Sequence, residues 1–397
     1  MVKASSRFGA VIASAMLIAQ VGPVAVASAV PGVAGDSITF AQIACFSGSC
    51  QIPGLQYRAG ILAAFHERNR QGGVQSRQLR LEVLDDRYEP DVAAELAKAV
   101  ESENDVFAII GGLGTPTAKR VAPVLRMANN IPFVGILSGA DFLRDAVRYP
   151  NVVHLRPSYS AEVHTLVYHL YEEYGARRFG ILYQDDSFGR SVLRATKEAL
   201  ASLGLRLVAK ATYSRHSHAV HDSVFTFAAA NTDAVLLAAA TRAAADSIVT
   251  ARSLGYKFVF AVLSVVGVDR LLGFVEDQID PTIASRIVMD VDDDSFELVR
   301  RFHSAFSAYQ KATPGEEERA LDSIALEGYI LGRFVVDVLE RIPDELTREQ
   351  FLATALSPEP VRIDEYKISF EVGSNSGSSF IRLDTLTNED SGREFSE

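Results

Sequence analysis

Acidic residues outnumber basic ones in this 397-residue sequence, and cysteine occurs only twice. The sequence has 39 lysines and arginines against 50 aspartates and glutamates, which gives a formal net charge of −11 at pH 7. Binding to nucleic acid requires a basic face, and binding to anionic lipid requires a basic patch, so this balance argues against both partners. Hydrophobic residues make up 48% of the chain, enough for two domains that each bury a core.

The sequence also lacks the short motifs of common enzyme classes. It has no G-x-S-x-G nucleophile elbow, no H-E-x-x-H zinc motif and no Walker A loop. The glycine cluster at 111–114 is not followed by the Lys-Ser/Thr pair that a phosphate loop needs, and the loop at 47–50 is not G-x-G-x-x-G. We therefore predict that the protein is not an enzyme and uses no cofactor.

Only one apolar run is long enough to span a membrane, and it lies at the N-terminus. Residues 8–30 carry no charge, follow Lys3 and Arg7, and include the small-x-small sequence at 27–29. This pattern predicts a signal peptide over residues 1–29 that is cleaved on export. The alternative is an uncleaved anchor, since about 20 apolar residues can cross a bilayer.

The two cysteines lie close together in the sequence. Cys45 and Cys50 are separated by four residues, which does not match the C-x-x-C pattern of metal or redox sites. In an oxidising compartment they are candidates for a disulfide that closes a small loop. Two free thiols are the alternative, because the geometry of the folded loop decides between them.

Strands and helices alternate along the rest of the chain, in two successive units. The first unit has predicted strands at 38–44, 79–84, 106–110 and 133–136, with helices at 55–70, 90–101 and 116–129. The second has strands at 178–183, 205–211, 234–239, 258–263 and 287–291, with helices at 161–174, 188–203, 218–230 and 242–254. Helices at 294–310, 321–341 and 347–356 and a β-rich segment at 362–386 follow. This order predicts an α/β protein with two doubly wound parallel sheets.

Several strand-to-helix turns of the first unit are candidates for ligand binding. Thr115 is suited to be an N-cap and Pro116 to be the first helical residue, at the carboxyl end of the third strand. The free N–H groups of such a helix start favour an anion. Turns after the first and fourth strands open on the same sheet edge and add Ser47, Gly48, Leu137, Ser138, Gly139 and Ala140. A capped helix and a tight turn are the structural alternative for each, but their convergence favours a ligand site.

Two acidic pairs follow corresponding strands of the two units. We expect Asp85 and Asp86 to bond nearby backbone at the end of their strand. Asp185 and Asp186 occupy the matching place in the second unit. Asp185 is kept as a candidate site residue because it would face the space between the units.

The sharpest alternative function is metal capture by histidines. His216, His218 and His221 lie within six residues, and imidazole is a common ligand of zinc and copper. Asp222 is the one carboxylate beside them. An exposed loop between a strand and a helix explains the same residues without a metal, and we expect no metal site.

The sequence resembles the type I periplasmic substrate-binding proteins of ATP-binding-cassette (ABC) transporters, of the leucine/isoleucine/valine-binding kind. The resemblance covers nearly the whole chain after the signal. It is carried by the order and spacing of several short pieces: Phe46-Ser47-Gly48, the stretch Asn69–Gly73, Leu84-Asp85-Asp86-x-Tyr88-x-Pro90, Gly114-Thr115-Pro116-Thr117, Ser138-Gly139-Ala140, Tyr183-Gln184-Asp185-Asp186-Ser187-Phe188-Gly189 and Leu326-Glu327-Gly328-Tyr329.

The resemblance implies a fold of two doubly wound parallel-sheet lobes joined by a three-strand hinge. Residues 36–156 and 292–376 are then expected to form lobe I, and residues 157–291 and 377–397 to form lobe II. The three crossings are expected near Arg156, Val291 and Ser376. The resemblance also implies a periplasmic monomer that closes on a small-molecule ligand and delivers it to an ABC permease in the inner membrane. A sensor that serves a receptor kinase or chemoreceptor is the alternative with the same fold.

The resemblance further assigns parts of a binding site to each lobe. In lobe I the ligand carboxylate is expected at Thr115, Thr117 and the turn at 138–140, with Ser47 nearby. In lobe II the expected contacts are Phe188, Thr241, Ser264 and Val265.

One departure from the family pattern concerns the ligand. Amino-acid binders of this family place a carboxylate in the last of these turns to pair with the ligand ammonium, whereas residues 263–268 contain no acid. A buried ammonium without a partner costs several kcal/mol. We therefore expect a carboxylate-bearing or neutral apolar ligand, with an aromatic group as one option, rather than an ordinary α-amino acid.

Overall fold

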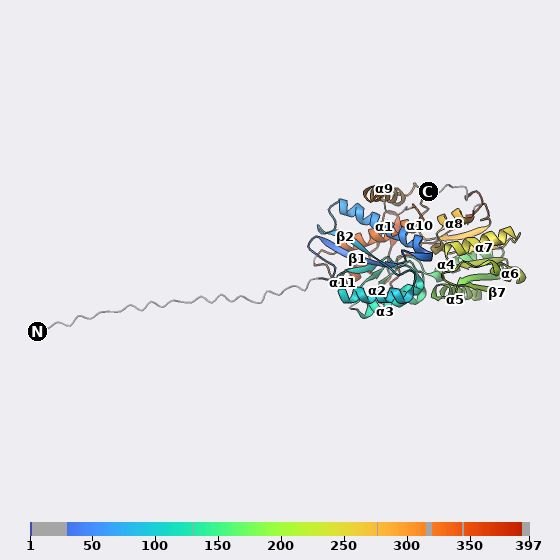
Figure 1. Ribbon diagram of the computed structural model, residues 1–397, viewed down its shortest axis with the longest axis horizontal. Helices are drawn as coiled ribbons and strands as arrows, with labels where there is room; N and C mark the ends of the chain where they lie inside the picture. Colours follow the sequence, from blue (N-terminus) through green and yellow to red (C-terminus); the bar gives the residue numbers. More distant parts are fainter. Residues whose placement is uncertain (2–29, 129, 276, 315–319, 344, 391–397) are drawn as a thin grey trace.

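The computed structural model describes Met1 and residues 30–128, 130–275, 277–314, 320–343 and 345–390. The predicted signal peptide lies outside these residues apart from Met1. The described chain forms two α/β lobes side by side, with α1, α2 and α3 in one and α5, α6 and α7 in the other (Figure 1). No helix among the described residues is both long and apolar enough to cross a bilayer.

The first lobe is built on a five-stranded parallel sheet in the order β2-β1-β3-β4-β5. Its strands are β1 Ser37–Ala44, β2 Gln78–Asp85, β3 Ala108–Ile110, β4 Phe133–Val134 and β5 Val152–Val153. One face packs with a large apolar cluster from α1 Gln51–Arg70, α9 Glu297–Ala312, α10 Ser323–Glu340 and α11 Arg348–Ala355. The other face packs with α2 Pro90–Glu103 and α3 Thr115–Met127. Short elements add η1 Gly48–Cys50, η2 Asp141–Leu143, β11 Val361–Ile363 and β12 Tyr366–Ile368.

The second lobe is built on a six-stranded sheet in the order β13-β10-β9-β8-β6-β7, in which β13 is antiparallel to β10. Its strands are β6 Phe179–Gln184, β7 Leu207–Tyr213, β8 Ala234–Ala238, β9 Val259–Val262, β10 Thr282–Arg286 and β13 Arg382–Leu386. One face packs with α4 Tyr159–Glu173 and α5 Ser187–Ser202. The other packs with α6 His221–Ala229, α7 Thr241–Ser253 and α8 Val268–Val275, and η3 Ser264–Val266 follows β9.

The chain passes between the sheets in three segments, 154–158, 287–296 and 369–381, which contain Arg156, Val291 and Ser376. Two of these segments lie side by side, because His154 bridges to Ser376. The predicted fold class, two doubly wound lobes joined by three crossings, is thus confirmed. The residue limits proposed for the lobes remain a prediction.

One predicted strand is wrong. The segment 287–291 is apolar and β-branched, which is typical of a strand, but the strand is β10 at Thr282–Arg286. Residues 287–291 begin the second crossing, where Ile287, Val288 and Val291 are at most 2% exposed. Burial in the apolar cluster of the first lobe, rather than pairing in a sheet, accounts for their apolar character.

Candidate ligand-binding site

A cavity of about 290 Å³ lies between the lobes, close to the lower end of the ~300–1,000 Å³ usual for ligand pockets. Its walls follow the carboxyl ends of parallel strands in both sheets, where open α/β folds bind ligands. The first lobe contributes Ser49, Cys50, Ile52, Pro53, Tyr88, Leu113, Gly114, Thr115 and Leu137. The second lobe, from the start of α4 onward, contributes Tyr159, Gln184, Phe188, Arg215, Ala239, Ala240, Thr241, Arg242, Val265, Arg270 and Phe274.

The structure brings part of the predicted site together around this cavity. The predicted residues in the lining are Thr115, Leu137, Phe188, Thr241 and Val265, and Cys50 joins them. The other predicted residues do not line it: Ser47, Gly48, Pro116, Thr117, Ser138, Gly139, Ala140, Asp185 and Ser264. Most of these lie in the same turns as lining residues, and their polar side chains form hydrogen bonds or ion pairs with other protein groups.

The start of α3 differs from the prediction in its capping. The N-cap is Gly114, at φ +98°, and no side chain caps the helix, so the predicted N-cap role of Thr115 is wrong. A Cβ at Gly114 would lie 2.4 Å from the Tyr88 ring, which explains why glycine occupies this position. Thr115 is the first helical residue, and Pro116 is therefore the second rather than the first.

The Thr115 hydroxyl instead joins a buried hydroxyl cluster. Its Oγ1 lies 2.7 Å from Ser138 Oγ and 3.3 Å from the Tyr159 hydroxyl. Ser138 Oγ also accepts from the Ala140 N–H, so Ser138 supports Thr115 from behind the cavity wall. Thr117 Oγ1 donates to the carbonyls of Leu113 and Gly114 within its own helix start.

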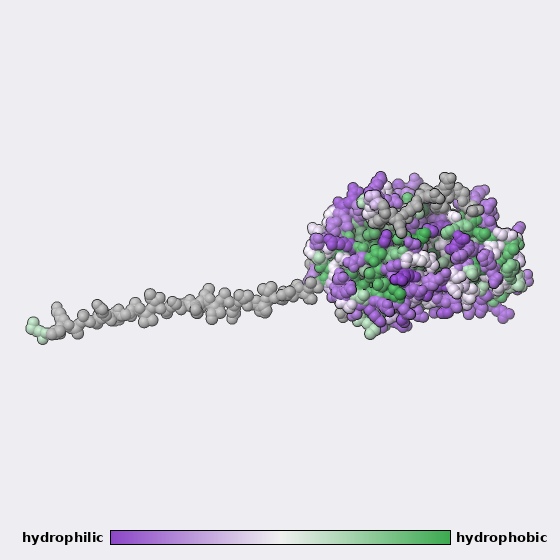
Figure 2. Space-filling model, in the orientation of Figure 1, coloured by the Kyte–Doolittle hydropathy of each residue, from purple (hydrophilic) through white to green (hydrophobic). Residues whose placement is uncertain are grey.

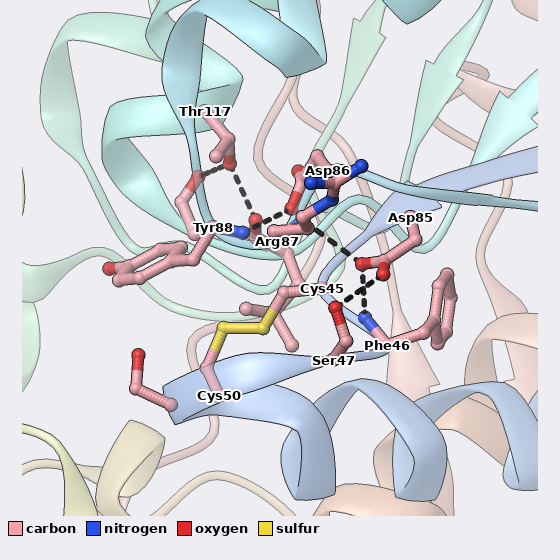
Figure 3. The surroundings of a disulfide bond; sticks show 12 residues. Cys45, Phe46, Ser47, Cys50, Asp85, Asp86, Arg87, Tyr88 and Thr117 are labelled. Carbon is pink, nitrogen blue, oxygen red and sulfur yellow. Dashed lines mark hydrogen bonds between the residues drawn. A yellow bond between two sulfur atoms is a disulfide. The ribbon is translucent and has the colours of Figure 1, made fainter. Parts of the chain in front are cut away.

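The first part of the loop after β1, at Phe46 and Ser47, is fixed to the end of β2, whereas Ser49 and Cys50 of the same loop line the cavity. A disulfide joins Cys45 to Cys50, with the Cα atoms 5.9 Å apart, and Cys50 lines the cavity. Figure 3 shows Ser47 pointing at Asp85, whose Oδ2 accepts from the Ser47 hydroxyl at 2.5 Å. Asp85 also accepts from the backbone N–H groups of Phe46 and Arg87. These bonds hold the pKa of Asp85 below its usual value although its partial burial opposes them.

The second acid of this pair also serves the backbone, as expected. Asp86 is fully buried and accepts from the Tyr88 N–H at 2.8 Å (Figure 3). Burial raises the pKa of Asp86 to about 7. The consequence for the site is that Tyr88, two residues further on, is placed in the cavity wall.

The corresponding pair in the second lobe does not supply a cavity carboxylate. Asp185 forms an ion pair with Arg190 at 2.6 Å, and its side chain is 56% exposed. Asp186 caps α5 by accepting from the Phe188 N–H, and it accepts from Gln184 Nε2 at 2.6 Å. Burial raises the pKa of Asp186, against the effect of these bonds.

Residues from the two lobes touch across the cavity. Gln184 Nε2 lies 3.2 Å from the Tyr88 hydroxyl, and its Oε1 accepts from Tyr213. Glu89, which does not line the cavity, pairs with the lining residue Arg215 at 3.1 Å and with His216 at 2.9 Å. The lobes are therefore closed on each other in this structure.

The histidine-rich segment is divided between different partners. His216 contacts Glu89 and Ser49 of the first lobe, whereas His218 pairs with Asp246 of α7. Across the part of the chain that the structure describes, no three potential ligands gather into a metal site. The segment instead contributes a contact between the lobes.

Ser264 lies in a buried polar network at the first crossing. Its Oγ accepts from Arg156 at 2.7 Å, and its backbone N–H donates to Glu162 at 2.9 Å. Arg156 is 1% exposed and also lies 3.6 Å from Glu327 of α10. The Ser264 hydroxyl is thus committed to holding the two lobes together.

Sequence reasoning missed the charged part of the site. Three arginines line the cavity, Arg215, Arg242 and Arg270, while its described lining residues include no aspartate or glutamate. Arg270 and Phe274 lie on α8, a helix that was not predicted. Its buried residues Val268, Leu271, Leu272 and Val275 have the i, i+3, i+4, i+7 spacing of an amphipathic helix, so the signal was present.

A family model described as a periplasmic binding protein matches residues 37–359. The chain belongs to the periplasmic binding protein family. A curated relative of this binding protein is a Leu/Ile/Val-binding protein homolog 7 from Brucella abortus, 25% identical over 48% of the chain and 49% of the relative. This binding protein therefore spans about half the length of the curated relatives it matches.

Solved structures match over most of both chains. A possible leucine/isoleucine/valine-binding protein from Rhodopirellula baltica is 26% identical, with a TM-score of 0.80, over 92% of this chain and all of that one. A fatty acid ABC transporter substrate-binding protein from Thermomonospora curvata is 21% identical, with a TM-score of 0.82, over 92% of each. A branched-chain amino acid ABC transporter protein from Thermus thermophilus with bound valine is 16% identical, with a TM-score of 0.79, over 89% and 94%. At these identities the last two show the fold of this binding protein and not its ligand.

Proposed function

We propose that this protein is an exported solute-binding protein that captures a small, carboxylate-bearing apolar molecule and delivers it to an ABC importer. The observation that carries the proposal is the composition of the cavity wall. Three arginines line it and none of its described residues is acidic, while most of the remaining wall is aliphatic or aromatic. Such a wall favours an anion with an apolar body and disfavours a ligand ammonium.

The importer is inferred from the family and its solved members. The similar structures named above belong to ABC systems for fatty acids and for branched-chain amino acids. A carboxylate is common to both ligand classes, whereas only the second carries an ammonium. The lack of an acid among the described lining residues agrees with the first class of chemistry, and the predicted signal peptide agrees with delivery from the periplasm.

Capture requires no chemical step in this proposal. The ligand binds between open lobes, and the contacts of Gln184 with Tyr88 and of Arg215 with Glu89 form when the lobes close. Closure removes water from the cavity, so each polar contact to the ligand becomes stronger. The closed shape is the one a permease would recognise.

A melting-temperature screen of the mature protein tests this proposal. The panel contains aliphatic and aromatic carboxylates, their primary amides and the branched-chain amino acids, and mass spectrometry identifies molecules that co-purify. Carboxylates are expected to raise the melting temperature through mass action. A protein that no panel member or co-purified molecule stabilises would contradict the capture function itself.

A further inference from the structure

Arg270 differs from the other two arginines of the cavity in having no ion-pair partner among the residues that the structure describes. Arg215 pairs with Glu89 at 3.1 Å, and Arg242 pairs with Asp246 at 2.9 Å. Arg270 forms no ion pair or hydrogen bond with any residue in the described ranges, and its guanidinium carbon lies 6.0 Å from the centroid of the Phe274 ring. Its guanidinium therefore has all its donors available to a ligand.

The surroundings of Arg270 make this lack of a partner costly. The side chain is partly buried, and burial lowers its pKa, while the charge of Asp322 acts in the opposite direction. Asp322 is itself buried and caps α10 by accepting from the Ala325 N–H. A guanidinium that is partly removed from water gains most from an anion placed directly against it.

The cavity has one buried end and one open end. Thr115, Tyr159 and Gln184 are at most 2% exposed, and Phe188 is 6% exposed. At the other end Phe274 is 38% exposed and the Arg242 side chain is 57% exposed. Arg242 and Arg270 both approach the Phe274 ring, which places the available cation at the open end.

The buried end is less suited to a carboxylate. Its hydroxyls already bond to one another, because Thr115 Oγ1 lies 2.7 Å from Ser138 Oγ and 3.3 Å from the Tyr159 hydroxyl. The rings of Tyr159 and Phe188 pack with their centroids 5.4 Å apart beside these groups. This end offers aromatic and aliphatic surface rather than an unpaired cation.

We propose that Arg270 of α8 binds the ligand carboxylate, and that the apolar body of the ligand points toward Tyr159 and Phe188. This inference rests on the proposed capture function and specifies its ligand as an anionic amphiphile. The orientation is the reverse of that implied by the family resemblance, in which the first-lobe turn at Thr115 holds the carboxylate. Arg270 is then the residue that separates carboxylates from neutral analogues.

The test uses calorimetric titration of the mature protein with two matched pairs of probes. The pairs are 4-methylpentanoate with 4-methylpentanamide and 3-phenylpropanoate with 3-phenylpropanamide, which differ only in the charged group. The proteins are the wild type, R270Q, R270K, T115V and the control R126Q, in which an exposed arginine of α3 away from the cavity is changed. Melting curves without probe confirm that each variant folds.

In the wild type, each carboxylate is expected to bind at least tenfold more tightly than its amide. R270Q is expected to lose about 10- to 100-fold in carboxylate affinity, the range for a hydrogen bond to a charged group. R270K restores part of it because the charge returns without the planar fork. T115V is expected to lose less carboxylate affinity than R270Q, and R126Q is expected to bind like the wild type. The affinity for the amides is expected to change little in any variant.

Three results would overturn the inference. Equal carboxylate affinity in R270Q and the wild type would leave the capture function intact and remove Arg270 from it. A larger loss in T115V than in R270Q would restore the first-lobe orientation. Failure of both carboxylates to bind the folded wild type would also overturn the role of Arg270. The capture function would then be tested by the wider melting-temperature screen.

Discussion

At the scale of single residues, Asp322 links the stability of this protein to pH. It is 3% exposed, and burial, with a smaller effect of Asp269, raises its pKa to about 7. Its Oδ1 accepts from the Ala325 N–H at the start of α10, while Oδ2 is buried without a hydrogen-bond partner among the described residues. The folded state thus keeps a proton that the unfolded chain, with an ordinary pKa near 3.9, has lost.

We predict that the free energy of unfolding falls as the pH rises from about 4 to about 7, because the unfolded state binds fewer protons over this range. The contribution of Asp322 is on the order of a few kcal/mol. In D322N, which keeps an acceptor for the cap, this contribution disappears and the protein is more stable than the wild type at pH 8. Urea unfolding at pH 5 and pH 8 measures the difference. The control is D105N, in which an exposed aspartate is changed. If the free energy of unfolding of D322N changed with pH as much as that of the wild type, the prediction would be refuted.

At the scale of elements, the loop between β7 and α6 and the start of α2 hold the lobes together. Glu89 pairs with both Arg215 and His216. The side chains of Glu89 and His216 are 44% and 45% exposed. Exposed pairs of this kind contribute about 0.2–1 kcal/mol each. The contact is therefore strong enough to bias closure and weak enough to open.

We predict that E89A reduces the population of the closed form of the ligand-free protein by about two- to fivefold. Small-angle X-ray scattering detects the change as a larger radius of gyration. E95A, at an exposed glutamate of the same helix, is the matched control. A radius in E89A no larger than in E95A would show that the contact does not stabilise closure.

The disulfide is a second constraint at this scale. It ties Cys45, which directly follows β1, to Cys50 in the cavity wall. Closing a loop of this length restricts the unfolded chain by about 2 kcal/mol in the chain-entropy model. Reduction is therefore expected to lower the free energy of unfolding by about 1–3 kcal/mol. Urea unfolding with and without reductant measures this loss. The Cys45→Ala/Cys50→Ala variant should not respond to reductant, and an unchanged wild type would contradict the expectation.

The sequence predicted the elements better than the polar contacts of the site. Alternating strands and helices identified both sheets, and strand ends identified Thr115 and Leu137 as cavity residues, while the family resemblance identified Phe188. The direction of each hydroxyl was not predictable, because Ser47 and Ser264 bond to residues far away in the sequence. Arg270 was missed with its helix, although the apolar spacing of α8 indicated one.

At the scale of the whole molecule, the two lobes share both a buried polar network and a cavity. Arg156, at the first crossing, contacts Ser264 of the second lobe and Glu327 of the first. The face shown in Figure 2 is mostly hydrophilic, with hydrophobic residues gathered over the lobe of the five-stranded sheet. The network at the crossings fixes how the lobes meet, and the cavity wall is the proposed determinant of the ligand.

We propose that this cavity accepts a carboxylate and rejects an α-amino acid. Leucine and 4-methylpentanoate are the sharpest pair of probes, because the second molecule is leucine without its amino group. Isothermal titration calorimetry of the mature protein is expected to show binding of 4-methylpentanoate and no binding of leucine in the micromolar range or tighter. Binding of leucine, isoleucine or valine at micromolar or lower concentration would show that the cavity does accept an α-amino acid.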